Sequence, residues 1–330
     1  MYNFIKNRTT QFSSYEWLVL AAIIVLPFIW EMLYLIELRL SINTLGTDVT
    51  RVWRPVAQAI LDGTPPYTPP AVDNKPPLWT AQQVIAEYTG HYVMVELLLM
   101  AIANLTIATG IWKIGTELRS AKIGQIAAFL YVLTIPVVNL SRISDATMGA
   151  ALLVLALGLR SPYRIGAITG GAVLTSPWAI FGIPVIVVYR FWQDWTSFAQ
   201  FVVAGVSLGV MSVSILWAGW GIESAIGAIQ WSIGLGDSYW TGGNNSLLRR
   251  SIFYSPLGWF IINGHYARQY AVVLIPAVFG ILYTRLTNRK IWVLFSLVIP
   301  LLFKPHWEFV FPVACLLSAI GWEQVSNTEY

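Results

Sequence analysis

Apolar runs that match the hydrocarbon thickness of a bilayer recur along most of this 330-residue sequence. Hydrophobic residues make up 56% of the chain and charged residues 11%, which is more apolar surface than a soluble domain can hide. We therefore expect an all-α polytopic membrane protein with a single domain over residues 1–330. The candidate spans are 17–36, 91–112, 123–140, 146–160, 165–189, 197–218, 266–284, 291–303 and 309–322.

Basic residues outside the apolar runs indicate how the chain crosses the membrane. They fall into three groups: Lys6 and Arg8; Lys113, Arg119 and Lys122; and Arg285, Arg289 and Lys290. The positive-inside rule puts all three groups in the cytoplasm only if 165–189 forms two helices, and not one kinked helix, around Ser176-Pro177-Trp178. The prediction is about ten helices, both termini inside, and two long outer segments at about 37–90 and 219–265. The compact loops favour a prokaryotic cell membrane with an extracytoplasmic site.

The first outer segment contains an amphipathic pattern. Val49, Val52, Trp53, Val56 and Ile60 recur at helical spacing, while Arg51 and Arg54 occupy the polar side. This pattern predicts a helix lying in the membrane interface. Gly63 closes the helix, and Asp48 stands at its start, where a carboxylate can cap free backbone N–H groups. From this position alone, Asp48 is equally consistent with a cap and with a functional acid.

A proline-rich stretch follows that helix. It includes Pro65-Pro66-Tyr67 and Lys75-Pro76-Pro77-Leu78-Trp79, and prolines restrict the backbone to extended conformations. Thr80-x-x-Gln83 has the form of a capping box, which predicts a second short helix ending near Gly90.

The second outer segment combines aromatic, amide and charged residues, including Asp237, Trp240, Asn244, Asn245 and the pair Arg249-Arg250. Aromatic rings stack on sugars, amides bond their hydroxyls, and guanidinium groups bind phosphate oxygens. The same composition also suits an interfacial aromatic belt with arginines, which many membrane proteins carry.

Two further positions carry charge near the outer surface. Asp145 lies at a helix junction, where a charge at membrane depth is costly unless it has a role, although a salt bridge to Arg142 would also explain it. His306 lies in the short turn Lys304-Pro305-His306-Trp307, whose cations suit a lipid phosphate or the membrane surface.

Several functions are disfavoured by what the sequence lacks. It has no P-loop and no His/Cys pattern for zinc, and its net charge of +4 includes no Lys/Arg run that would suit nucleic acid. Gly205-x-Ser207-x-Gly209 matches a nucleophile elbow, but it lies in an apolar span, where small residues four apart, as also at Gly166 and Gly170, let helices approach closely.

The ordered features together resemble the GT-C membrane glycosyltransferases, and within them the polyprenyl-phosphate-mannose-dependent family (glycosyltransferase family 87-like). The resemblance rests on five elements: Asp48 after the first span; Leu61-Asp62-Gly63-Thr64-Pro65-Pro66-Tyr67; Lys75-Pro76-Pro77-Leu78-Trp79; Asp145 opening the fourth span; and Gly243-Asn244-Asn245-Ser246-Leu247. A further element is the turn Lys304-Pro305-His306-Trp307, which stands in the place of the family's Ser-Pro-x-x-Trp turn. It has lysine where that turn begins with serine.

The resemblance implies an inverting enzyme that transfers mannose or another hexose from a polyprenyl or dolichyl monophosphate to an extracytoplasmic glycan, lipid or protein. Asp48 is then the general base, and Asp145 orients the acceptor. The expected donor-phosphate ligands are Arg249, Arg250, Lys75 and His306. The expected sugar or acceptor contacts are Trp79, Tyr67, Asp237, Trp240, Asn244 and Asn245. No metal cofactor is predicted, although a divalent ion is compatible with such a site.

Two other classes remain open on the sequence. A transporter or flippase of polyprenyl-linked sugars would use the same arginines and aromatics without chemistry, and it would place its charges at the midplane of repeated halves. A non-catalytic subunit of a glycosylation complex would need none of the acids for transfer.

Overall fold

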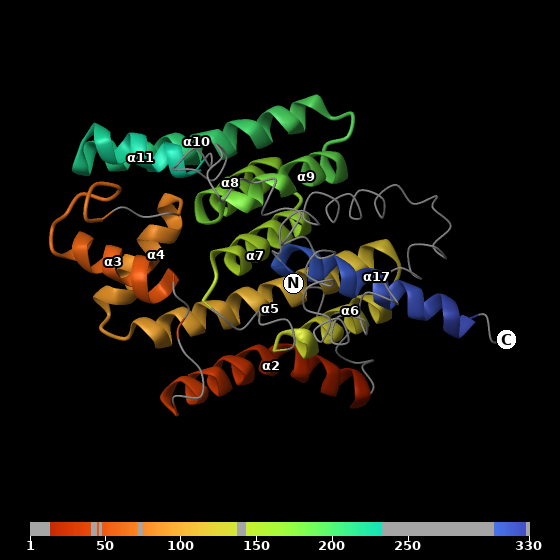
Figure 1. Ribbon diagram of the computed structural model, residues 1–330. Coiled ribbons are helices and arrows are strands. Elements are labelled where there is room, and N and C mark those ends of the chain that lie inside the picture. The colour runs from red at the N-terminus through yellow and green to blue at the C-terminus, as the bar shows by residue number, and fades with distance from the viewer. Residues whose placement is uncertain are drawn as a thin grey trace, which may run out of the picture.

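The computed structural model describes residues 14–40, 45, 48–71, 75–136, 143–232 and 307–327. Throughout this part of the chain, every regular element is a helix, and most of the helices lie roughly along one common direction (Figure 1). The predicted runs 266–284 and 291–303 lie outside the described residues. The described chain is all-helical and consistent with a helical membrane protein, and the total of about ten spans stays a prediction.

Three of the described helices are long and apolar enough to cross a membrane: α2 (Ser14–Arg39), α5 (Tyr92–Leu118) and α10 (Trp195–Trp220). The other bundle helices are shorter. They are α6 (Ala121–Thr134), α7 (Asp145–Gly158), α8 (Pro162–Thr175), α9 (Ile183–Arg190) and α17 (Trp307–Asn327). Each coincides with a predicted apolar run.

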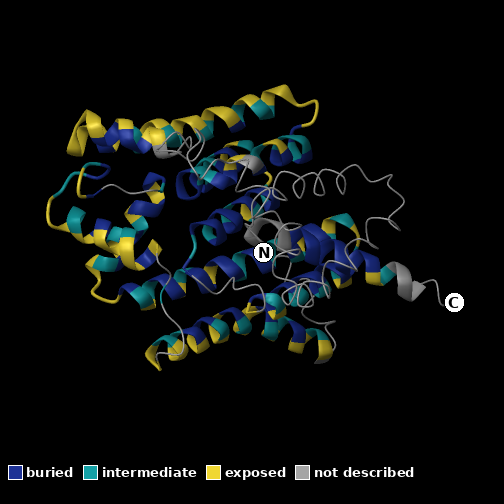
Figure 2. Cartoon of the chain, viewed as in Figure 1, coloured by how far each residue is buried: buried dark blue, intermediate teal, exposed yellow. Residues whose placement is uncertain are grey.

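The outer faces of the long helices remain apolar. On α10, the exposed side chains include Val203, Val206, Val210 and Ile215. Figure 2 shows exposed residues concentrated along α10 and α2, whereas buried residues fill the helices between them. An apolar surface of this kind is stable when it faces lipid, so α10 and α2 flank a core formed by α5 and the shorter helices.

Two close contacts between α8 and α10 show the relative direction of these helices. A methyl group added at Gly170 would lie 2.9 Å from the carbonyl oxygen of Gly205, and one added at Gly166 would overlap that of Phe201. From one contact to the next, the residue numbers increase by four on both helices, so α8 and α10 run parallel. The chain must therefore reverse between them.

The reversal takes place in the segment predicted to form one kinked helix or two helices. Ser176 ends α8, the 3₁₀ helix η2 (Pro177–Gly182) follows, and α9 then leads away. The guanidinium of Arg190, the last residue of α9, lies 3.8 Å from the carboxylate of Glu117 near the end of α5. The structure thus has two separate helices here, as the charge argument requires.

One end of the bundle carries additional short helices. They are the π-helix η1 (Val49–Trp53), α3 (Arg54–Leu61), α4 (Pro77–Tyr88) and α11 (Ile222–Ser232). We call this the α3–α4 end, and Figure 1 shows it on the left. The C-termini of α5, α7 and α9 lie at the opposite end of the bundle.

The amphipathic pattern of the first outer segment is confirmed. Val49, Trp53 and Val56 are buried, whereas Arg51 and Arg54 are exposed. Gly63, with φ of 96°, ends α3 in the left-handed conformation expected of a C-terminal glycine. Pro55 stands at the start of α3, directly after η1, and has no N–H to bond a carbonyl of the preceding turn, so it marks the change from π- to α-helix.

The α8–α10 contact leads to a first prediction. Gly166→Ala should lower the free energy of unfolding by about 1–3 kcal/mol, because the new methyl overlaps a backbone carbonyl that cannot move aside. Unfolding in detergent by denaturant titration would measure the change.

Gly209→Ala is the matched control, since no heavy atom lies within 4 Å of its added methyl group. Alanine favours helix over glycine, so this variant should be neutral or more stable by up to about 1 kcal/mol. Equal losses from both variants would contradict the proposed role of the α8–α10 contact.

Candidate functional site

Two of the predicted site residues, Lys75 and Asp145, form an ion pair at the α3–α4 end. The Lys75 ammonium lies 2.7 Å from Asp145 Oδ1, and the side chains are 11% and 6% exposed. The two residues are 70 positions apart in the sequence. The proline-rich segment is therefore attached to the beginning of α7, and the described partner of Asp145 is Lys75. Arg142, the partner considered from the sequence, lies outside the described residues.

The N-terminus of α7 is a favourable position for an acidic side chain. The Ser144 side chain accepts a hydrogen bond from the Thr147 backbone N–H, and Asp145 lies in the first turn. A negative charge is favourable there because the backbone N–H groups at a helix N-terminus carry partial positive charge. The prediction that Asp145 opens this helix is confirmed.

Asp145 is also set deep along the bundle axis. Gly110 of α5 meets Val154 of α7, and Lys113 lies beside Gly158, so the two helices run parallel. The offset of 44 residues between Gly110 and Val154 (154 minus 110) places Asp145 level with Ala101, nine residues after the start of α5 at Tyr92. This corresponds to about 14 Å at 1.5 Å per residue.

One tryptophan faces the Lys75 ammonium, and a second supports the first. The ammonium nitrogen lies 5.5 Å from the ring centre of Trp53, close enough for a cation–π interaction. Trp53 in turn meets Trp79 edge to face, with ring centres 5.0 Å apart. Trp79 is fully buried. It was predicted to contact a sugar, but here it has no open ring face and supports Trp53.

Tyr67, the other aromatic residue predicted to contact sugar, is also buried. Its hydroxyl lies 2.9 Å from the Lys75 carbonyl oxygen, to which it donates, and 3.0 Å from the Thr80 hydroxyl. A methyl group added at Gly227 of α11 would meet the Tyr67 side chain at 2.5 Å, so the two outer segments touch here. In this structure Tyr67 fixes the backbone that carries Lys75.

Asp48, the predicted base, is exposed and directly precedes η1. The predicted capping hydrogen bond is absent, because its side chain accepts no bond from the first backbone N–H groups of the helix. Asp48 is five residues before Trp53, whose ring faces Lys75. The carboxylate therefore has no capping role, and it directly precedes the helical turn that carries Trp53.

The predicted capping box at Thr80 and Gln83 is wrong. The helix α4 already begins at Pro77, so both residues lie inside it. Proline is favoured in the first helical turn, and Pro76-Pro77 therefore starts the helix four residues earlier, with Pro76 and not Thr80 as the N-cap. The Gln83 side-chain oxygen instead accepts a hydrogen bond from the Tyr92 hydroxyl. The prediction that the helix ends near Gly90 is confirmed, since α4 ends at Tyr88 and Gly90 has φ of 70°.

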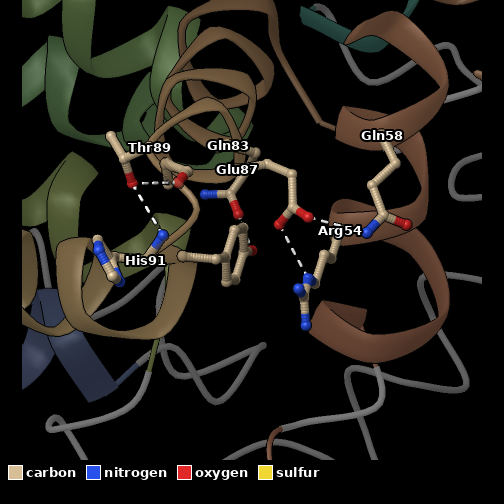
Figure 3. Close-up of polar contacts among 8 residues, drawn as sticks. Arg54, Gln58, Gln83, Glu87, Thr89 and His91 are labelled. Atoms are coloured by element: carbon tan, nitrogen blue, oxygen red, sulfur yellow. Dashed lines mark hydrogen bonds and ion pairs between the residues drawn. The ribbon is translucent and has the colours of Figure 1, made fainter. Parts of the chain in front are cut away.

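A second polar group at this end was missed by sequence reasoning. The Glu87 carboxylate accepts hydrogen bonds of 2.8 Å from Arg54 Nε and from Gln58 Nε2. Figure 3 shows Arg54 and Gln58 reaching from one helix to Glu87 on the other. The Arg54 guanidinium also lies 5.7 Å from the ring centre of Tyr92. We call Arg54, Gln58 and Glu87 the α3–α4 clamp.

The electrostatics of the clamp favour a charged glutamate. Burial by itself would raise the pKa of Glu87, but the hydrogen bonds from Arg54 and Gln58 and the charge of Arg54 outweigh it and hold the pKa below its ordinary value of 4.5. The ion pair is therefore intact at neutral pH.

The remaining predicted site residues lie outside the described residues: Asp237, Trp240, Asn244, Asn245, Arg249, Arg250 and His306. Within the described ranges, no three His, Cys, Asp or Glu side chains come together as a metal site would require.

Comparisons with known proteins give no relative. No protein-family model matches the chain, and neither the curated proteins nor the solved structures contain a match. The function must therefore be argued from the site itself.

The buried ion pair gives a second prediction. Lys75→Met or Asp145→Asn alone should each destabilise the protein by about 3–5 kcal/mol, because each leaves its partner's charge or donor buried without compensation. The double variant should lose less than the sum of the two. Denaturant unfolding in detergent measures all four proteins of this cycle, and strict additivity would show that the two residues do not interact.

The clamp gives a third prediction, on pH. A carboxylate whose folded pKa lies below its unfolded value contributes stability above that unfolded value, and the contribution is lost as the pH falls through the folded pKa. The melting temperature of the wild type relative to Glu87→Gln should therefore be higher at pH 7 and should fall below pH 4.5. A constant difference between pH 7 and pH 3 would contradict this prediction.

Proposed function

We propose that this protein is a GT-C-type glycosyltransferase that moves a hexose from a polyprenyl monophosphate to an acceptor outside the cytoplasm. The observation that carries the proposal is the joining of Lys75 to Asp145 beside Trp53, at the end of the bundle where Asp48 is exposed. Such a site offers a cation for a phosphate and a separate carboxylate for a hydroxyl group.

Lys75 supports the phosphate-binding part of the proposal. Its side chain is 11% exposed, and the ammonium lies between Asp145 and the ring of Trp53, so it is held in place before any ligand arrives. A phosphate monoester or diester could displace one of its contacts, since a lysine has three donors. The departing lipid phosphate gains negative charge during transfer, and a cation already in position stabilises that charge without reorganising.

Asp48 supports the base in the proposal. Its exposed carboxylate can accept the proton that the acceptor hydroxyl loses as its oxygen attacks the anomeric carbon. The new carbon–oxygen bond forms as the bond to the phosphate breaks, which inverts the anomeric centre and releases the polyprenyl phosphate. Asp145 then balances Lys75 and orients the site, while Arg249, Arg250 and His306 are the proposed further phosphate ligands.

The charge distribution supports an extracytoplasmic site. The described basic residues of the opposite end are Lys113, Arg119, Lys122, Arg160, Arg164 and Arg190, against Glu16, Glu117, Asp194 and Glu323. At the α3–α4 end, acids outnumber bases: Glu37, Asp48, Asp62, Glu87, Glu96, Asp145 and Glu223 against Arg39, Arg51, Arg54 and Lys75. By the positive-inside rule, the opposite end faces the cytoplasm.

The test is a transfer assay with purified protein, radiolabelled polyprenyl-phosphate sugars and total membrane lipids as acceptors. The wild type should label a product from one donor. Asp48→Asn should lower the rate of transfer by at least about 100-fold, because a positioned base contributes about 10²–10⁴ in rate, while donor binding persists.

Glu223→Gln is the control, because this exposed acid lies at the same end and forms no ion pair among the described residues. Its rate should match that of the wild type. Normal transfer by Asp48→Asn would show that Asp48 is not the base. Donor-dependent lipid movement without a labelled product would instead identify a flippase.

A further inference from the structure

The α3–α4 clamp lies on the more exposed side of the helices that carry the Trp53–Trp79 contact beside the buried Lys75–Asp145 pair. Glu87 belongs to α4, the helix that also carries Trp79. Arg54 and Gln58 belong to α3, which follows directly after the turn that carries Trp53. The clamp therefore joins the same two helices whose tryptophans meet beside Lys75.

The clamp contains one more hydrogen bond than an ordinary surface ion pair. Both carboxylate oxygens of Glu87 accept a 2.8 Å hydrogen bond, one from a guanidinium and one from an amide. Glu87 is 12% exposed, whereas Arg54 is 47% exposed. Exposed pairs contribute little alone, but two directional bonds to one carboxylate also fix how α3 is rotated on α4.

Rotation of α3 matters because η1 continues into it without a break. The backbone of Arg54 ends η1 with helical angles, and Val49, Trp53, Val56 and Ala57 are all buried on the side that faces the core. If α3 turns or tilts, Trp53 moves relative to Trp79 and Lys75, and Asp48 moves at the beginning of the same continuous helix.

We propose that Glu87 is a positioning residue of the site, one that fixes Asp48 and Trp53 by holding Arg54 and Gln58. This inference rests on the proposed function for its catalytic consequence. It assigns a role to three residues that the sequence did not single out as part of a site. Glu87 does not contact Lys75 or Asp145 in the described contacts, so its effect passes through the orientation of η1 and α3.

The kinetic test compares Glu87→Ala with the wild type in the transfer assay. Because the clamp orients the base more than the phosphate ligand, kcat should fall about five- to ten-fold, while KM for the polyprenyl-phosphate donor stays within about two-fold. The charge swap, Glu87→Arg with Arg54→Glu, should recover at least half of the lost rate. Because a smaller folded fraction would also lower the apparent kcat without changing KM, each rate is divided by the concentration of folded protein, measured by size-exclusion chromatography.

Arg51→Ala is the matched control for Arg54→Ala. Arg51 is also an exposed arginine of the η1–α3 segment, and no ion pair to it occurs among the described residues. Arg54→Ala should reproduce the kcat loss of Glu87→Ala, and Arg51→Ala should not. Equal losses from the two arginine variants would overturn the clamp and indicate a general effect of positive charge.

A distance measurement tests positioning without relying on activity. The chain has one cysteine, the buried Cys315, so Cys315→Ala gives a background for two spin labels. Leu61→Cys on α3 and Ile85→Cys on α4 place them at positions that are 41% and 63% exposed. The distance distribution should be narrow with the clamp intact, broader in Glu87→Ala, and narrow again in the charge swap.

The two measurements separate the two proposals. If the wild type transfers no sugar from any donor, the proposed function fails, while the label distances still decide whether the clamp orients α3. If Glu87→Ala loses activity with unchanged distances, or broadens the distances without lowering kcat, the positioning role is overturned.

Discussion

The arrangement at the α3–α4 end depends on one buried ion pair. Asp145 lies deep along the bundle, and a carboxylate at such depth is unfavourable unless a cation reaches it. Lys75 supplies that cation from the proline-rich segment, at 2.7 Å. The segment must therefore bend inward to α7, where the Lys75 ammonium faces Trp53 and Trp53 packs on Trp79.

The surrounding contacts keep the pair in place from several directions. Tyr67 holds the Lys75 backbone and packs against α11, so the first outer segment is connected to the chain that follows α10. Glu87 connects α3 to α4 on the more exposed side. These polar contacts add directional bonds to the apolar cluster of Val49, Trp53 and Trp79, and together they restrain the short helices of this end.

Local features of this end could be predicted from the sequence, and contacts between distant segments could not. The buried face of Val49, Trp53 and Val56, the glycine at position 63 and the helix start at Asp145 all follow from patterns within a few residues. The capping box failed because adjacent prolines start α4 earlier than Thr80. The partners of Asp145 and Glu87 are 70 and 33 residues away, a separation over which no spacing rule applies.

The segment formed by η2 and α9 has a consequence for the surrounding lipid. Its six and eight residues rise about 2.0 and 1.5 Å each, which gives a length of about 24 Å. A typical hydrocarbon core is about 30 Å thick, so η2 and α9 together are about 6 Å shorter than a straight crossing of such a core. Ile180, which is 43% exposed, lies on this segment. In a bilayer, a segment shorter than the hydrocarbon core is accommodated by local thinning or by flanking side chains that reach the interface, and Arg190 ends this segment.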